Sequence, residues 1–284
     1  MQLRAYFTVT KPGIIAGNLI TTAGAYALGS QGTNSLWQCL TLLLSMGCVI
    51  GSACVWNNYI DKGADQKMSR TANRPFAKNT LAIPPALLFA TRLGTLGMTT
   101  LISTTNPLAA TLAGAGFAIY VLVYSFLKYH SSHATLVGSL AGAVPPLVGY
   151  CAARGTWDLG ASILLLMMTC WQMSHFFAIA IYRLSDYTAA SIPVWPVVKG
   201  IPSTKRQMLF YTIGFIITAW LLVLSGYATR PLFFAATFSG TYWLILALRG
   251  VMTYQGKRGD CRWARLMFIA SLIAITLTFL VMWF

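Results

Sequence analysis

Long hydrophobic runs alternate with short polar connections along this chain of 284 residues. A helix needs about 20 mostly apolar residues to cross the hydrocarbon core of a membrane. Stretches of roughly this length predict nine spanning helices, at 13–29, 36–56, 83–103, 108–127, 135–153, 159–181, 207–225, 231–249 and 266–284. The pattern therefore predicts an all-α polytopic membrane protein, with residues 1–284 forming one domain within the lipid bilayer.

The composition agrees with a membrane protein and argues against a nucleic-acid partner. Charged residues make up 9% of the chain and hydrophobic residues 57%, whereas about 25% of a soluble protein is charged. The net charge of +15 would suggest nucleic-acid binding in a soluble protein. Here the basic residues cluster between hydrophobic runs, as the positive-inside rule describes. Because the first run begins by Pro12, we expect no cleavable signal ahead of it.

The basic residues also predict an orientation. If the N-terminus is cytoplasmic, the connections on that side carry Arg4, Lys11, Lys62, Lys67, Arg70, Arg74, Lys78, Lys128, Arg183, Lys199, Lys205, Arg206, Arg249, Lys257, Arg258, Arg262 and Arg265. The opposite side carries only Arg154 and Arg230. This asymmetry predicts a cytoplasmic N-terminus and, after nine crossings, a C-terminus on the other side. Arg92 falls inside the third run, where it either snorkels to the interface or marks a misplaced boundary.

A polar segment, NNYIDKGADQKMSRTANRP at 57–75, follows the second hydrophobic run. Asn57, Asp61 and Asp65 recur every four residues, so on a helix their side chains project from one face. Two carboxylates and an amide oxygen in this arrangement suit Mg²⁺, a hard cation that often shares its ligands with a substrate phosphate. Lys67, Arg70 and Arg74 follow closely and suit phosphate oxygens. The segment predicts a site for a metal-bound diphosphate, and a solvated loop with scattered charges is the alternative.

A second polar segment, 182–200, follows the sixth hydrophobic run. The second and sixth runs are four crossings apart, so both segments are predicted on the same side of the membrane. Tyr182 and Asp186 are four residues apart and would share one helical face. Two acidic helix ends that face each other across a bundle could hold metal ions on one diphosphate.

The remaining polar and small residues have simpler explanations. His175 is the only histidine inside a predicted span, where a functional role and a packed core histidine are about equally expected. His130 and His133 lie in a short connection, where solvated side chains are expected. Gly138 and Gly142 form a GxxxG that predicts close helix packing. The six cysteines form no CxxC and no zinc spacing, which predicts buried packing residues.

Taken together, these segments resemble the UbiA-type intramembrane prenyltransferases, and within them the branch that farnesylates haem. The family motif N-x-x-x-D-x-x-x-D matches Asn57, Asp61 and Asp65, and the branch's longer form NNxxDxxxDxxMxRTxxRP matches 57–75. Further matches are KPGIIAGNLIT at 11–21, GSLAGAVPPLVGYCA at 138–152, WQMSHFFAIAIYRLSDY at 171–187 and IPVWPVVKG at 192–200. The last three hydrophobic runs resemble the family only in being apolar helices.

The resemblance implies nine helices around a central cavity open to lipid, in a bacterial inner membrane. It also implies a reaction in which farnesyl diphosphate, haem B and water give haem O and diphosphate, with the farnesyl group joined to the 2-vinyl carbon. Haem B is then a substrate and Mg²⁺ the cofactor. Assembly proteins of respiratory oxidases become plausible partners.

The resemblance assigns roles to particular residues. The expected Mg²⁺ ligands are Asn57, Asp61, Asp65 and Asp186, and Tyr182 would orient the diphosphate. The expected diphosphate contacts are Lys67, Arg70, Arg74, Lys128, Arg183 and Lys199. His175 and Trp171 are the expected haem contacts. The chain departs from the family pattern at Gly63, where relatives often carry Asp, and at Lys128-Tyr129, where they often carry Lys-Arg.

Other functions remain open at this point. The same fold could prenylate an aromatic acid, a quinone precursor or a chlorophyllide, although YRLSDY and WQMSHF favour haem. A transporter would carry its polar site near the midplane, whereas these acids fall at helix ends. A haem-oxidising enzyme would need several axial histidines within its spans, and this chain has one.

Overall fold

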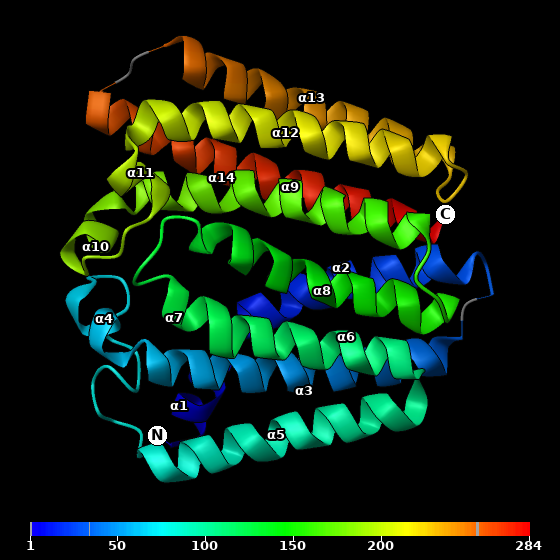
Figure 1. The fold of residues 1–284 in the computed structure, drawn as a ribbon, viewed down its shortest axis with the longest axis horizontal. Coiled ribbons are helices and arrows are strands. Elements are labelled where there is room, and N and C mark those ends of the chain that lie inside the picture. The colour runs from blue at the N-terminus through cyan, green and yellow to red at the C-terminus, as the bar shows by residue number, and fades with distance from the viewer. Residues whose placement is uncertain (1, 34, 254–255) are drawn as a thin grey trace.

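The computed structural model describes residues 2–33, 35–253 and 256–284, and the side chains of Gln2 and Lys257 lie outside the described set. Throughout this part of the chain the regular structure is helical, which confirms the predicted all-α class. The long helices run side by side with nearly parallel axes (Figure 1). They are α2 (Pro12–Ser30), α3 (Leu36–Ile60), α5 (Ile83–Thr104), the continuous α6–η1–α7 (Pro107–Leu127), α8 (Ala134–Arg154), α9 (Leu159–Tyr182), α12 (Gly200–Leu224), α13 (Arg230–Met252) and α14 (Gly256–Leu280).

Short helices mark one end of the bundle. Helices α4 (Lys62–Lys67), α10 (Leu184–Ala189) and α11 (Trp195–Val198) lie together on the left of Figure 1, beside the start of the chain in α1 (Gln2–Val9). Both polar segments, 57–75 and 182–200, are found here, so we call it the motif end. The C-terminus follows η2 (Val281–Trp283) at the opposite, far end.

Among the described residues, eight helices are long and apolar enough to cross a membrane, so the protein is a multi-pass membrane protein. The ninth long helix, α2, is not one of the eight. Its sequence PGIIAGNLITTAGAYALGS is rich in Gly and Thr, which lowers its hydropathy. Those small residues allow close packing instead. A Cβ on Gly149 of α8 would lie 2.2 Å from the Thr22 carbonyl oxygen of α2, so the two helices are nearly in backbone contact.

Two helices begin earlier than the hydrophobic pattern predicts. The predicted runs 207–225 and 266–284 correspond to helices that start at Gly200 and Gly256. The early part of each helix, before the predicted run, contains charged residues, which hydropathy excludes from a span. The charges neutralise each other, because Lys205 Nζ donates to Asp260 Oδ1 at 2.6 Å and both side chains are buried. Arg92 lies within α5 with an exposed side chain, so the predicted boundary of that helix holds.

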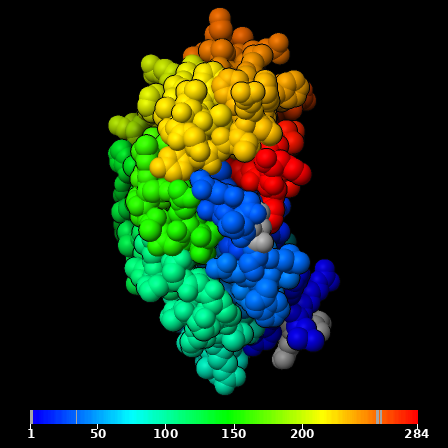
Figure 2. All heavy atoms as spheres, turned by 90° about the vertical axis from the view of Figure 1, so that its right-hand side faces the viewer, coloured from blue at the N-terminus to red at the C-terminus, as the bar shows by residue number. Residues whose placement is uncertain are grey.

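The C-terminal segment packs against α2 at the far end. Figure 2 looks onto this end and shows residues of the α2–α3 connection next to the C-terminal residues. They lie between the green α6–α8 part of the bundle and the yellow and orange α12–α13 part. Gln31, Tyr227 and Phe284 line a small cavity here, far from the two polar segments.

Candidate active site

A cavity of about 720 Å³ opens between α2, α3, η1, α8, α9 and α14. Its wall is polar at the motif end, where it is lined by Lys11, Asn57, Asp61, Asp65, Arg70, Arg74, Lys128, Tyr129, Tyr182 and Tyr187. The deeper wall is mostly apolar and aromatic and includes Cys54, Tyr120, Tyr124, Trp171, Gln172, His175, Phe176 and Phe268. A cavity of this kind suits a ligand with an anionic head and a long apolar body.

Asn57, Asp61 and Asp65 keep helical spacing across the break between α3 and α4. The Asp61 N–H donates to the Asn57 carbonyl at 2.9 Å, and the Asp65 N–H donates to the Asp61 carbonyl at 2.8 Å. The three side chains are buried and line the cavity, as their four-residue spacing predicts.

Each carboxylate of this segment is paired with a cation. Asp61 forms an ion pair with Lys128 and accepts a hydrogen bond from the Tyr129 hydroxyl at 2.8 Å. Both carboxylate oxygens of Asp65 accept a hydrogen bond from Arg74 Nη1, at 3.0 and 2.8 Å. Lys128 and Arg74, predicted from the resemblance as diphosphate contacts, therefore lie next to the predicted metal ligands. Tyr129, at a departure from the family pattern, replaces a cation with a hydroxyl donor.

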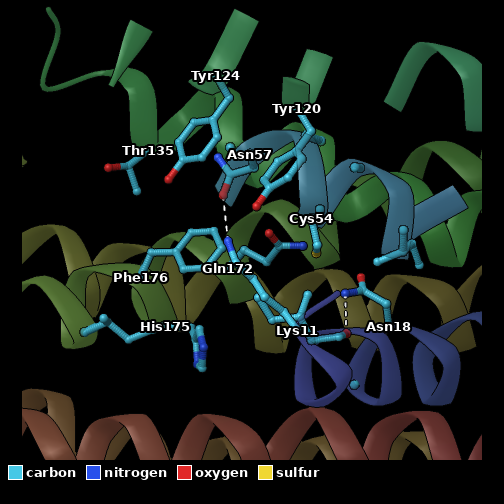
Figure 3. A pocket seen from close by; sticks show the side chains of 18 of the residues that line it. Lys11, Asn18, Cys54, Asn57, Tyr120, Tyr124, Thr135, Gln172, His175 and Phe176 are labelled. Carbon is cyan, nitrogen blue, oxygen red and sulfur yellow. Dashed lines mark hydrogen bonds between the residues drawn. The ribbon is translucent and has the colours of Figure 1, made fainter. Parts of the chain in front are cut away.

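Lys11 is a cavity residue that the sequence interpretation missed. Its Nζ donates to Asn57 Oδ1 at 2.7 Å across 46 residues of sequence, as the upper dashed line in Figure 3 marks. Its backbone has φ 54°, a left-handed conformation that costs a non-glycine residue about 1–3 kcal/mol. The only signal in the sequence was its position at the start of KPGIIAGNLIT.

Burial makes the cations at this end receptive to an anion. Burial lowers the pKa of Lys11 to about 8, and it also lowers the pKa of Lys128, an effect that Asp61 opposes. The low-dielectric surroundings disfavour the ammonium form, and a bound diphosphate would favour it.

The second polar segment contacts the first through Asp186. Its Oδ1 accepts hydrogen bonds from the Ser69 backbone N–H at 3.1 Å and the Ser69 hydroxyl at 2.8 Å. Arg183 Nη1 lies 4.0 Å from Asp186 Oδ2. The Asp186 side chain is buried, and it is not among the residues that line the cavity. It links the two segments from behind the cavity wall.

The other predicted contacts divide between the cavity and its surroundings. Arg70 and Tyr182 line the cavity, whereas Lys67, Arg183 and Lys199 do not. Lys67 and Lys199 are exposed at the motif end.

The donor set at the motif end fits a hard divalent cation. Within the described residues, no three His, Cys, Asp or Glu side chains form a group that could hold a metal. The oxygen donors Asn57, Asp61 and Asp65 nevertheless share one cavity wall, and oxygen ligands supplemented by substrate phosphate suit Mg²⁺. A cation there would compete with Lys11, Lys128 and Arg74 for the same oxygens, and a diphosphate could accept those three donors in exchange.

His175 is fixed in the deeper part of the cavity. Its ring stacks on Trp171 with centroids 4.8 Å apart, and its Nδ1 lies 2.7 Å from Ser271 Oγ. The Ser271 hydroxyl also lies 2.6 Å from the Phe268 carbonyl, which can only accept a hydrogen bond. An arrangement in which the hydroxyl donates to that carbonyl leaves the proton of His175 on Nδ1 and the lone pair of Nε2 open to a ligand.

A π-helical turn arranges the tyrosines opposite. In η1 (Ile119–Tyr124) the rings of Tyr120 and Tyr124 stack 5.6 Å apart and extend toward Asn57 (Figure 3). A Cβ on Gly138 would lie 2.8 Å from the Tyr124 ring, so this glycine makes room for a cavity side chain. Gly142 does the same for Gln172. The GxxxG thus receives side chains, rather than the helix backbone that its pattern predicts.

Comparison with known proteins identifies the family. The model of the UbiA prenyltransferase family matches residues 18–272. The chain belongs to the UbiA prenyltransferase family. Protoheme IX farnesyltransferase from Serratia proteamaculans is 46% identical over 276 residues, which are 97% of this chain and 92% of that protein. The family resemblance predicted from the motifs is confirmed.

Solved structures of other proteins share this fold. Digeranylgeranylglyceryl phosphate synthase superposes with a TM-score of 0.80 at 13% identity, over 99% of both chains. A UbiA homologue from Archaeoglobus fulgidus bound to GPP and Mg²⁺ superposes with a TM-score of 0.68 at 14% identity, over 98% of this chain and 99% of that one. At such identities the likeness concerns the fold alone.

Proposed function

We propose that this UbiA-family protein transfers a farnesyl group from farnesyl diphosphate to the 2-vinyl group of haem B, with addition of water, giving haem O and diphosphate. The single observation that carries the proposal is one cavity with a cation-paired Asn57–Asp61–Asp65 wall at the motif end and an open His175 Nε2 deeper inside. The Serratia protoheme IX farnesyltransferase, 46% identical, supports haem as the acceptor and farnesyl as the donor group.

The diphosphate head is proposed to bind at the motif end. Asn57, Asp61 and Asp65 would hold Mg²⁺, and the homologue bound to GPP and Mg²⁺ supports a divalent metal with a prenyl diphosphate. The metal would offset negative charge that develops on the leaving oxygens. Asp186, whose Oδ1 accepts from Ser69 outside the cavity lining, would join these ligands only if its carboxylate turned into the cavity.

The cations are proposed to exchange partners when the substrate binds. Lys11, Lys128 and Arg74 leave their carboxylate or amide oxygens and donate to the diphosphate, with Arg70 and Tyr182 beside them. Such preorganised donors, aimed at oxygens that gain charge as the allylic bond breaks, supply the largest catalytic contribution in many enzymes. Lys67, Arg183 and Lys199 lie outside the cavity, and their positive field would attract the anionic substrate to the motif end.

The porphyrin is proposed to lie deeper, with its iron at His175 Nε2. The Trp171 indole, anchored by its N–H to the Ser271 carbonyl at 2.7 Å, fixes the orientation of the imidazole. The faces of Tyr120 and Tyr124 shield the farnesyl cation until the vinyl carbon attacks it. The mechanism needs no nucleophilic side chain, since the vinyl group itself attacks.

The deciding experiment is mass spectrometry of haem products. The purified protein in lipid nanodiscs, given Mg²⁺, farnesyl diphosphate and haem B, is expected to form a hydroxyethylfarnesyl adduct of haem. Parallel reactions with an aromatic acid, a quinone precursor or a chlorophyllide are expected to remain unchanged. Prenylation of one of those acceptors, with haem unmodified, would overturn the assignment of the acceptor.

The haem site has its own test. His175→Ala is expected to weaken haem B binding, followed by the absorption of the bound haem, while binding of farnesyl diphosphate is retained. His133→Ala, which alters an exposed histidine outside the cavity, is the control. Unchanged haem binding and turnover in His175→Ala would remove the proposed ligand.

The proposal also includes the membrane, the orientation and the partners of the enzyme. We place it as one integral-membrane domain in a bacterial inner membrane, with a cytoplasmic N-terminus, where haem B and farnesyl diphosphate both partition. Assembly proteins of respiratory oxidases, as consumers of modified haem, are proposed partners.

A further inference from the structure

Gln172 is an unpaired polar residue within the apolar part of the cavity. Its side chain is 4% exposed and lines the cavity from α9. Within the described residues, its Oε1 has no hydrogen-bond partner. An unpaired buried amide oxygen costs about 1–3 kcal/mol, so in native proteins such an atom usually has a function or a bound partner.

The fold reserves space for this amide. A Cβ on Gly142 of α8 would lie 2.2 Å from Gln172 Oε1 and 2.6 Å from Nε2, so only glycine at this position leaves room for the amide. The unpaired oxygen of Gln172 costs free energy, and the space that holds its amide exists only because residue 142 is glycine. Residues on two different helices, α8 and α9, are therefore both needed to place this amide in the cavity.

The amide lies between the two halves of the proposed site. Gln172 and His175 are three residues apart on α9, so their side chains are neighbours on one helical face. Figure 3 shows the Gln172 amide below Asn57 and beside Cys54, with His175 further along α9. A group held by this amide would lie next to a porphyrin bound at His175.

We infer that Gln172 holds and orients the water molecule that adds to the substrate, which makes it a positioning residue; this rests on the proposed function. In that reaction the C–O bond to the allylic carbon breaks, and diphosphate leaves with the electron pair. The terminal vinyl carbon then forms the new C–C bond, which leaves a cation on the carbon next to the ring. Water adds to that carbon as the hydroxyl, and its proton passes to the departing diphosphate.

An amide suits this role better than the other polar groups of the cavity. The carboxylates and ammonium groups are held in pairs at the motif end, and an ionised group beside the cation would be alkylated or would repel it. An amide oxygen accepts a hydrogen bond from water without removing the proton, so the water stays neutral until it attacks. The apolar wall around it excludes further water, which would otherwise hydrolyse the farnesyl cation before the C–C bond forms.

The test compares two products by mass. Without oriented water, the cation loses a proton instead and gives a farnesylated haem that is lighter by one water molecule. Gln172→Leu is expected to raise the ratio of this dehydrated adduct to the hydroxylated adduct at least tenfold. Gly142→Ala, which displaces the amide without altering its chemistry, is expected to shift the ratio in the same direction. Gln207→Leu, a glutamine of α12 outside the cavity, is the control.

Each outcome separates this inference from the proposed function. An unchanged product ratio in both variants overturns the role of Gln172. Loss of both adducts, with the protein still inserted and the wild type active, also overturns it, because C–C bond formation precedes the water step. If the wild type itself forms no haem adduct, the proposed function fails instead.

Discussion

At the residue scale, the acidic side chains of the cavity are already neutralised. Asp61 forms an ion pair with Lys128, and Asp65 forms one with Arg74. The carboxylates proposed for the metal and the cations proposed for the diphosphate therefore neutralise each other before either ligand binds. Removing one partner of such a buried pair leaves an uncompensated charge. Metal and diphosphate are therefore expected to bind together, because each releases the partners of the other.

The carboxylates give the first prediction. Asp61→Ala and Asp65→Ala should each lower turnover by about 100-fold or more, the scale on which loss of one preorganised charge contact affects catalysis. Turnover of farnesyl diphosphate by purified, membrane-inserted protein is the measurement. Asp158→Asn, which changes a carboxylate at the start of α9 while keeping an N-capping side chain, should remain active. Activity retained in both alanine variants would dismiss the metal assignment.

Lys11 gives the second prediction. Lys11→Ala should raise the KM for farnesyl diphosphate by about 10- to 100-fold, since a hydrogen bond to a charged group contributes about 1.5–3 kcal/mol. Lys11→Arg keeps the charge and should restore part of the affinity. Lys78→Ala removes an exposed cation of the motif end and should leave KM unchanged. Equal increases in KM for Lys11→Ala and Lys78→Ala would show that Lys11 acts only through the overall positive charge of the motif end, without a direct contact to the diphosphate.

The residue scale also marks the limit of sequence reasoning. The spacing of Asn57, Asp61 and Asp65 predicted one helical face, because helix geometry acts within a few residues. The Lys11–Asn57 and Tyr129–Asp61 contacts join residues 46 and 68 positions apart, so no local pattern could indicate them. The tautomer of His175 depends on Ser271, 96 residues away.

At the element scale, hydropathy predicted where helices exist better than where they begin. It located all nine long helices of the described chain but started α12 and α14 too late. A buried Lys205–Asp260 pair compensates charges that the hydropathy index counts separately. The π-helical turn at Ile119–Tyr124 was likewise not predicted, because an apolar run such as IYVLVY suits an α-helix equally well.

Helix packing gives the third prediction. Gly149→Ala should destabilise the protein by about 1–3 kcal/mol, the usual cost of overpacking, because the added Cβ would lie 2.2 Å from the Thr22 carbonyl oxygen. Thermal unfolding of the detergent-purified protein measures the loss. Gly114→Ala is the matched control, since its Cβ would meet only Met98 at an ordinary 3.7 Å. Equal unfolding temperatures for the two variants would contradict the close approach of α2 and α8.

At the scale of the whole molecule, crossing parity was the most informative argument from the sequence. Counting hydrophobic runs predicted that residues 57–75 and 182–200 lie at one end, and the Ser69–Asp186 hydrogen bonds join those segments. That parity does not involve α2, but the side of the N-terminus does, and α2 is a long helix without the hydropathy of the other eight. If α2 did not cross the membrane, the N-terminus would lie on the other side from the motif end.

Orientation therefore gives the last prediction, measured by thiol labelling of full-length protein whose six cysteines are first replaced by alanine. Thr33→Cys and Ser225→Cys place single thiols on exposed positions of the far end. A membrane-impermeant maleimide should label both in intact cells, because the positive-inside rule puts the charge-poor end outside. Lys78→Cys, at the charge-rich motif end, should react only after the membrane is permeabilised. Labelling of Lys78→Cys in intact cells would reverse the orientation. The side of Thr33 is fixed by α3, so the test of α2 is Thr8→Cys, at an exposed position of α1. Labelling of Thr8→Cys in intact cells, with Lys78→Cys protected, would show that α2 fails to cross while leaving the orientation of the other helices intact.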